Sequence, residues 1–179
     1  RRRLNNLGNL YAQLNLIPGL SFKTAFNYYL NRTDNSNYQS VDHNLGPAYY
    51  TQGIMTVDQT RILNYTFHSL LTYNKSIVDH DFNALLGTEY NYNDLYYTNQ
   101  ERRGYDNDLL HSLAAGKTVF EATDNVARSK LISYFARLNY DYKNTYLLSA
   151  SIRRDGSSRF ATNNKWGYFP AISAGWVVS

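Results

Sequence analysis

The sequence of 179 residues contains no cysteine, three prolines, one methionine and no long apolar run. Without cysteine, the chain has neither a disulfide framework nor a thiolate metal site. Charged residues make up only 18% of it and the mean hydropathy is -0.54. No apolar run approaches the roughly 18–20 residues that a membrane-spanning helix needs. These absences exclude a disulfide-stabilised scaffold and a helical membrane protein.

Aromatic residues are abundant instead, at 16% of the chain with 18 tyrosines. Tyrosine favours strands. Its apolar ring and polar hydroxyl also suit a boundary between an apolar environment and water. The net charge of +4 is small, and the basic residues are scattered among Asp and Glu outside one cluster at Arg1–Arg3. We therefore expect no nucleic-acid partner. The basic, Asn-rich start predicts no signal peptide, so an exported protein would contain this chain as an internal piece.

Apolar and polar residues alternate with a period of two along much of the chain, which indicates half-buried strands. The alternation is interrupted where Leu70, Leu85 and Phe135 fall among the polar residues. Seven strands are predicted, within residues 9–16, 20–28, 63–74, 81–90, 134–141, 146–154 and 166–178. In the last of these, one face carries Trp166, Tyr168, Ile172, Ala174, Trp176 and Val178.

The predicted strands are long, and their connections alternate in length. A tilted strand needs about 9–11 residues to cross a bilayer, whereas strands of soluble proteins average about 5–6 residues. Short links at 17–19, 76–79 and 143–144 alternate with long links at about 33–60, 98–126 and 155–165. Outer-membrane barrels have this asymmetry, with short periplasmic turns and long extracellular loops. The predicted fold class is all-β: a segment of an antiparallel up-and-down transmembrane β-barrel with about seven long strands.

Seven strands do not close a bacterial barrel, which has an even number of strands and no free edge in lipid. The chain is therefore predicted to form an arc of a larger wall. Tyrosines near the predicted strand ends, such as Tyr73, Tyr140 and Tyr146, fit the aromatic girdles of a barrel. They fit ordinary cross-strand packing equally well.

The end of the chain carries a recognisable segment. The stretch SYFARLNYDYKNTYLLSASIRRDGSSRF, followed by WGYFPAISAGW, resembles the signature segment of the SusC/RagA family of TonB-linked outer-membrane proteins. The resemblance covers about residues 133–179; residues 4–30 match more loosely, and residues 31–128 match only in pattern. Its signature positions include Arg154, Asp155, Gly156, Ser157, Ser158, Arg159, Phe160, Trp166, Gly167, Phe169 and Pro170. The sequence departs from the family at Ala136 and Val177.

The resemblance implies a barrel of about 22 strands with an N-terminal plug. It implies a place in the outer membrane of a Gram-negative bacterium of the Bacteroidetes type, in contact with its lipid. The implied partners are a SusD-like surface lipoprotein that captures glycans or peptides, and the TonB complex, which acts through a region outside this chain. Residues 1–179 would then be part of one barrel domain, without its plug and remaining strands. We expect no enzyme activity and no cofactor.

The signature residues are expected to act structurally. Asp155-Gly156-Ser157-Ser158 has the chemistry of a turn, because Asp and Ser bond to nearby backbone and Gly tolerates a positive φ. Arg154 and Arg159 flank this turn and are suited to pairing with carboxylates or with lipopolysaccharide phosphates. Pro170 has no N–H to donate, which predicts a bulge or a weakly paired position.

Two short sequences resemble metal sites without completing one. Asp79-His80-Asp81 lies in a predicted turn with no third partner at a fitting spacing. Asp106-Asn107-Asp108 opens like a calcium loop but lacks its later Gly and Glu. No metal site and no catalytic residues are predicted.

The segments around 38–50 and 96–108 are expected to face the cell exterior, and their tyrosines to contact the substrate or the lipoprotein lid: Tyr49, Tyr50, Tyr96, Tyr97 and Tyr105. In the strand near residues 128–142, Leu138 is expected to face lipid and Asn139 the lumen. An alternative function is also open. A secreted, soluble all-β carbohydrate-binding module would use surface Tyr and Trp to stack on sugars.

Overall fold

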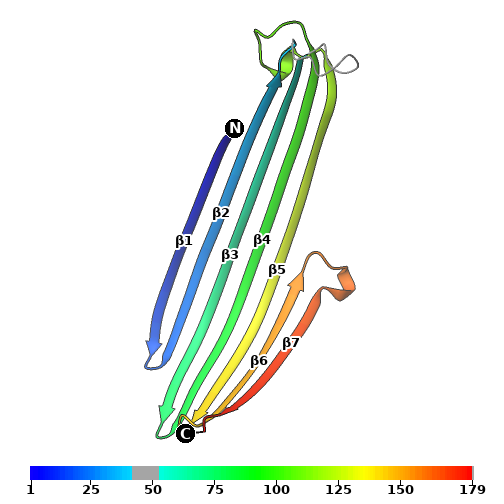
Figure 1. Ribbon diagram of the computed structural model, residues 1–179. Coiled ribbons are helices and arrows are strands. Elements are labelled where there is room, and N and C mark those ends of the chain that lie inside the picture. Colours follow the sequence, from blue (N-terminus) through cyan, green and yellow to red (C-terminus); the bar gives the residue numbers. More distant parts are fainter. Residues whose placement is uncertain (42–52, 179) are drawn as a thin grey trace. The chain divides into compact units, whose positions relative to one another are not determined.

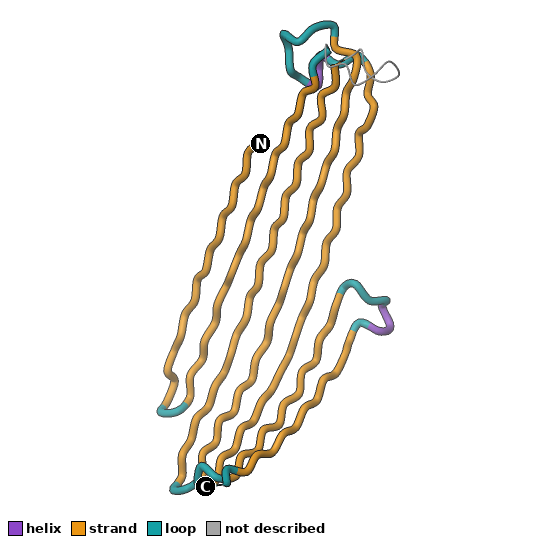
Figure 2. Tube along the Cα trace, viewed as in Figure 1, coloured by secondary structure: helices purple, strands orange, loops and turns teal. Residues whose placement is uncertain are grey.

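The computed structural model describes residues 1–41 and 53–178, which form seven strands in one sheet with the order β1-β2-β3-β4-β5-β6-β7 (Figures 1 and 2). Two 3-10 turns, η1 (Leu113–Ala115) and η2 (Thr162–Asn164), lie in loops. No helix in the described residues is long and apolar enough to span a membrane. The strands are β1 (Arg2–Ile17), β2 (Leu20–Gln39), β3 (Gly53–Ile77), β4 (His80–Tyr105), β5 (Thr118–Tyr142), β6 (Tyr146–Ser157) and β7 (Trp166–Trp176).

The predicted fold class is confirmed, and so is the alternation of connection lengths. Each strand pairs with the next one in the chain, as in an up-and-down meander. Short turns follow β1, β3 and β5, whereas the connections after β4 and β6 are longer (Figure 1). Residues 40–52 separate β2 from β3. In such a meander, connections of the first kind lie at one end of the strands and those of the second kind at the other.

Six of the strands are longer than predicted, whereas β7 ends at Trp176, two residues before its predicted end, and two long links are correspondingly shorter. The link predicted at 33–60 is confined to residues 40–52, and the link predicted at 98–126 is confined to residues 106–117. β3, β4 and β5 reach 25, 26 and 25 residues. The alternating pattern marks only the part of a strand with one apolar face. Backbone hydrogen bonds between strands also continue through segments that are polar on both faces, such as Asp34–Asn37. In these segments apolar and polar residues do not alternate, so the sequence pattern does not indicate a strand.

The short turns follow from local backbone preferences. Gly19 has a φ of +84°, and its carbonyl accepts a 2.8 Å hydrogen bond from the Asn74 N–H. Lys143 and Asn144 have positive φ values of 56° and 52°, as hairpin turns that match the twist of the strands require. The Asp141 carboxylate accepts a 2.7 Å hydrogen bond from the Asn144 N–H and stabilises this turn.

The chain divides into two compact units, which are described separately. Unit 1 comprises Arg1–Asn6, Tyr29–Leu63 and Asp94–Arg128. Unit 2 comprises Leu7–Tyr28, Asn64–Asn93 and Ser129–Ser179. The buried hydrophobic side chains among the described residues are few: Ala25 in unit 2, and Ile54, Met55 and Tyr105 in unit 1.

Unit 2 has two distinct faces, which the strand register defines. Leu138, Ala150 and Ile172 are aligned across β5, β6 and β7 on what we call the apolar face. Its side chains are open to the surroundings, with Leu138 49% and Ile172 78% exposed. Because neighbouring residues in a strand point to opposite sides, Asn139, Ser149 and Ser173 are aligned on the polar face.

The β6–β7 hairpin is short. Its strands have 12 and 11 residues, and the ladder between β5 and β6 runs only from Leu131 to Tyr142 on β5. Among the described residues, the part of β5 from Thr118 to Ser129 therefore has no β6 partner. The register between β6 and β7 continues without an extra residue through the pair Ile152–Pro170. Of the two alternatives predicted for Pro170, the bulge is therefore absent, whereas the weakly paired position stays a prediction: Pro170 has no N–H to donate, and its place opposite Ile152 keeps the register.

Candidate functional site

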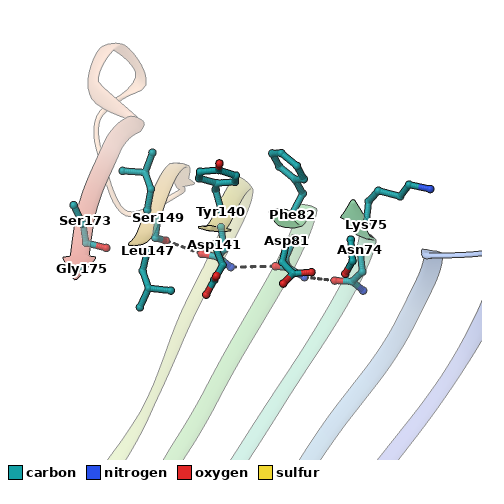
Figure 3. Close-up of a pocket in the computed structure, with 15 residues that line it drawn as sticks. Asn74, Lys75, Asp81, Phe82, Tyr140, Asp141, Leu147, Ser149, Ser173 and Gly175 are labelled. Carbon is teal, nitrogen blue, oxygen red and sulfur yellow. Dashed lines mark hydrogen bonds between the residues drawn. The ribbon is translucent and has the colours of Figure 1, made fainter. Parts of the chain in front are cut away.

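A ladder of polar side chains crosses the polar face of unit 2. Asn139 Nδ2 donates to Asn83 Oδ1 at 3.0 Å and Ser149 Oγ donates to Asn139 Oδ1 at 2.7 Å, while Asn83 bonds onward to Asn74 (Figure 3). Asp81 and Asp141 point to the same side as Asn74, opposite to Phe82 and Tyr140. An open cavity of about 580 Å³ at this end of unit 2 is lined by residues of both faces, including these carboxylates and amides. Carboxylates and amides together give this cavity acceptors and donors for a polar ligand.

Arg153 is the centre of a second polar network on the same face. Its Nε donates to both Asp155 carboxylate oxygens at 2.8 and 3.0 Å, and its Nη2 donates to Ser133 Oγ at 2.9 Å. The Glu89 carboxylate lies 3.7 Å away. Sequence reasoning did not single out Arg153, although its place beside Arg154 in an alternating strand assigns it to the opposite face.

The interruptions of the sequence pattern have a structural cause. Leu70, Leu85 and Phe135 lie together around a cavity of about 420 Å³ that His68, Glu89 and Arg137 also line. The Phe135 ring covers Gly87, where an added Cβ would lie 2.3 Å from two ring atoms. The Arg153 guanidinium lies 5.5 Å from the centre of the Phe135 ring. The polar face therefore includes the Phe135 ring with charged side chains around it. This arrangement is suited to stacking and hydrogen bonding with a ligand.

Two aromatic rows border the apolar face of unit 2. The turn-side row is Tyr142, Tyr146 and Trp176, whose rings stack at centroid distances of 6.3 and 6.5 Å. The loop-side row is Tyr134, Trp166 and Tyr168; the rings of Tyr134 and Trp166 stack at 6.2 Å.

The two rows are separated by about the height of a membrane. Trp166 and Trp176 are the first and last residues of β7, which is 11 residues long. Tyr134 and Tyr168 lie eight residues from the turn-side row and Trp166 lies ten, and eight to ten steps along a strand cover about 26–33 Å, or about 20–25 Å of height at a tilt of about 40°. The apolar band of an outer-membrane barrel is about 25 Å tall between its aromatic girdles. The rows thus have the spacing of girdles, which ordinary cross-strand packing does not require.

The signature residues tie the loop-side ends of β6 and β7 to the middle of β5. Ser158 Oγ accepts a hydrogen bond from the Lys130 N–H at 2.8 Å, and the Ser158 N–H donates to the Lys130 carbonyl at 2.9 Å. The Ser157 N–H donates to the Lys165 carbonyl at 3.0 Å, and Asp155 holds Arg153. Gly156 lies against Trp166, where an added Cβ would come within 2.7 Å of the indole. These contacts agree with a structural role, which stays a prediction. Phe160 and Phe169 are largely exposed.

Unit 1 contains a clamp between its two connections. The Asp108 carboxylate accepts hydrogen bonds from Ser40 Oγ at 2.6 Å, Tyr38 Oη at 2.8 Å and the Val41 N–H at 3.0 Å. The Tyr38 ring stacks on His111 at 4.0 Å. The donors, Ser40 first, lower the pKa of Asp108, and burial together with the bond to Asp108 raises the pKa of Tyr38 to about 12. This interaction joins residues about 70 positions apart, so the sequence pattern could not reveal it.

The loop tyrosines are not all in loops. Tyr96, Tyr97 and Tyr105 belong to β4, because this strand continues to Tyr105. Tyr97 Oη donates to Asp58 at 3.3 Å, and the buried Tyr105 donates to the Ser112 carbonyl at 2.9 Å. Their predicted loop position is therefore wrong, and their contact with a ligand stays a prediction. Tyr49 and Tyr50 lie outside the described residues.

The two sequences that resemble metal sites have other partners. His80 Nδ1 lies 2.7 Å from Tyr140 Oη, and Asp79 pairs with Lys143 at 3.7 Å. Asp106 pairs with Lys117, and Asp108 forms the clamp. No cluster of three or more possible metal ligands occurs in the part of the chain that the structure describes.

No protein-family model matches the chain, but curated proteins and solved structures do. The chain is 35% identical over 94% of its length to TonB-dependent receptor P39 of Formosa agariphila. It is 34% identical over 64% of its length to TonB-dependent receptor SusC of Bacteroides thetaiotaomicron. A structure of the RagAB peptide transporter superposes on 96% of the chain with a TM-score of 0.90 and 26% identity. The chain spans only 16%, 11% and 19% of these three proteins.

Proposed function

We propose, from the premise that the chain is a segment of a SusC/RagA-type TonB-dependent receptor, that the full-length protein imports oligosaccharides or peptides across the outer membrane. The observation that carries the proposal is the two-sided wall of unit 2. Its apolar face lies between two aromatic rows at a membrane's spacing, and its polar face carries amides, carboxylates and Arg153. An arc with lipid on one side and an aqueous passage on the other needs these two faces.

The soluble carbohydrate-binding module is disfavoured by the same faces. Leu148, Ile152 and Ile172 are 45%, 49% and 78% exposed on one continuous apolar face. Soluble proteins rarely expose such large apolar patches to water. The relatives are named as receptors and transporters, and we propose no catalytic role.

In this proposal, the chain is part of one barrel domain that further strands complete and a plug fills. A SusD-like lipoprotein delivers the substrate from the cell surface, and the TonB complex supplies the energy. The peptide cargo is supported by the likeness to RagAB, described as a peptide transporter. An oligosaccharide is the other cargo that the resemblance of residues 133–179 to the SusC/RagA family implies. The hydrogen-bonding ladder at Asn74, Asn83, Asn139 and Ser149 suits either cargo, because both expose many donors and acceptors.

Uptake by intact cells tests the proposal. Cells that carry the full-length receptor should accumulate a fluorescent oligosaccharide or peptide from a substrate panel, and deletion of tonB should abolish accumulation. A surface lipoprotein should co-purify with the receptor. A receptor that supports uptake of no member of the panel, or uptake that persists without TonB, would contradict the proposal.

The orientation of the strands gives a separate prediction. An epitope tag inserted after Leu110, in the exposed connection that follows β4, should be accessible to antibody on intact cells. A tag inserted at Asp79, in the short turn after β3, should be accessible only after the outer membrane is permeabilised. The reverse pattern would place the short turns outside the cell and overturn the orientation.

The clamp at Asp108 is expected to order the connections of unit 1. Asp108→Ala removes the acceptor for Ser40, Tyr38 and the Val41 N–H, so proteolysis near Leu109 and Leu110 should become several-fold faster. The control is Asp106→Ala, which removes only an exposed pair with Lys117. Equal cleavage of the two variants would show that the clamp does not order the loop.

The pH dependence of the clamp has a definite sign. Because its partners hold the pKa of Asp108 below its ordinary value of 3.8, the folded state favours the ionised carboxylate. The stabilisation is present above about pH 4 and is lost as the pH falls through the lowered pKa. Protection from an acid-tolerant protease should therefore be unchanged between pH 7 and pH 5 and should disappear only in stronger acid.

A further inference from the structure

Arg154 occupies an unusual place for a charged side chain. It lies on the apolar face of unit 2, aligned between Tyr134 on β5 and Tyr168 on β7. Its guanidinium lies 4.1 Å from the centre of the Trp166 ring and 5.3 Å from that of Tyr168. The cation is therefore held in the loop-side aromatic row by its neighbours.

The charge of Arg154 is not balanced within the described residues. Its Nε is buried and has no hydrogen-bond partner there, and no described carboxylate pairs with the guanidinium. Arg153, one residue earlier on the polar face, is matched by Asp155, Ser133 and Glu89. A cation next to a low-dielectric surface is costly unless an anion compensates it.

A groove on the same face begins at this cation. It has a volume of about 420 Å³ and is lined by Leu86, Tyr134, Ala136, Ile152, Arg154 and Tyr168. Ala136 and its partner Ile152 form the floor below the aromatic row, toward the middle of the apolar face. An apolar groove with one cation at its end matches a molecule with an apolar chain and one anionic head.

We propose that this groove binds a phosphate-bearing lipid of the outer leaflet, with the phosphate on Arg154 and an acyl chain along Ala136 and Ile152. The inference rests on the membrane position in the proposed function. A guanidinium presents several N–H donors in one plane and pairs well with phosphate oxygens, and its stacking on Trp166 fixes its direction. The aromatic row lies at the height where lipid headgroups begin. The lipid thus supplies the anion that Arg154 lacks.

Lipid retention by the full-length receptor tests the site. The receptor is purified in mild detergent, and its binding of phosphatidic acid and of diacylglycerol with the same acyl chains is measured by native mass spectrometry. Wild type should prefer phosphatidic acid by roughly tenfold or more, the value of a charge-assisted hydrogen bond. Arg154→Gln should abolish the preference. Arg159→Gln, which makes the same charge change in the connection after β6, should retain it.

A second variant tests the acyl chain. Ile152→Trp fills the groove without changing its charge and should lower binding of both lipids. If inorganic phosphate displaces phosphatidic acid and Ile152→Trp has no effect, the site binds free phosphate and the proposal is wrong. Equal retention by wild type and Arg154→Gln would also overturn it. If the variants import substrate normally and show no change in lipid binding, only this inference is refuted. If the receptor stays soluble without detergent, the proposed function is refuted.

Discussion

Ile172→Arg is expected to destabilise the full-length barrel by about 2–4 kcal/mol if Ile172 lies near the bilayer midplane. Ile172 is 78% exposed on the apolar face, midway along β7 between Trp166 and Trp176. At this depth, arginine has neither water nor a counter-ion. Urea unfolding of the receptor folded in lipid vesicles, followed by tryptophan fluorescence, measures the change.

The control for this variant is Ser173→Arg. Ser173 is the next residue, so its side chain points to the polar face, where it is aligned with Ser149. The same substitution there meets water and should cost much less. Asn139 follows Leu138 in β5 and its side chain also points to the polar face. It is a poorer control because its amide is part of the hydrogen-bonded ladder.

A soluble protein with a packed core would also suffer from a buried arginine, so a third variant separates the two cases. Leu138→Phe adds apolar volume on the same face. Lipid should accept the larger side chain with little change in the free energy of unfolding, whereas a close-packed core would lose about 1–3 kcal/mol. A loss of that size would place Leu138 in a protein core.

Gly19→Ala is expected to be the most damaging small substitution in the short turns. Gly19 has a φ of +84°, and an added Cβ would lie 2.2 Å from the backbone oxygen of Asn74. A left-handed conformation costs about 1–2 kcal/mol for a residue with a Cβ. The contact is with backbone, which moves less easily than a side chain, so about 1–3 kcal/mol of overpacking is added.

Gly175→Ala is the matched control for this effect. Its added Cβ would meet Leu147 at 3.5 Å or more, which is an ordinary van der Waals contact. Both variants can be measured by the same unfolding titration in vesicles. Equal stability of Gly19→Ala and Gly175→Ala would mean that the first turn can adopt another backbone conformation.

The sequence predicted the parts of the fold that depend on local alternation. The seven strands, the two faces around Leu138 and Ile172, and the short turns at Gly19 and Asn144 are all local features. The alternation does not mark the strand segments 31–37 and 98–103, because there both faces are polar and only backbone pairing defines the strand. Hydropathy carries no information about such pairing.

The site was less predictable than the fold because its contacts join distant residues. Asp108 and Tyr38 are far apart in sequence, and Phe135 covers Gly87 from the neighbouring strand. Each pair depends on register, which a single sequence does not give. The family segment includes Arg154, but the absence of a described partner for its Nε follows from the fold and not from the local sequence.

The short β6–β7 hairpin leaves β5 with an open edge. From Thr118 to Arg128, side chains on both sides of this strand are exposed, and no β6 residue in the described structure pairs with this stretch. Unpaired N–H and C=O groups in a row form a template on which a passing chain can add a strand, and exposed Val119 and Phe120 would favour such growth. Glu121 and Asp124 place like charges along this edge, so a second copy of the receptor that stacks in parallel and in register would bring carboxylate against carboxylate. The acidic residues on this part of β5 would therefore oppose parallel, in-register growth of a further strand along its edge.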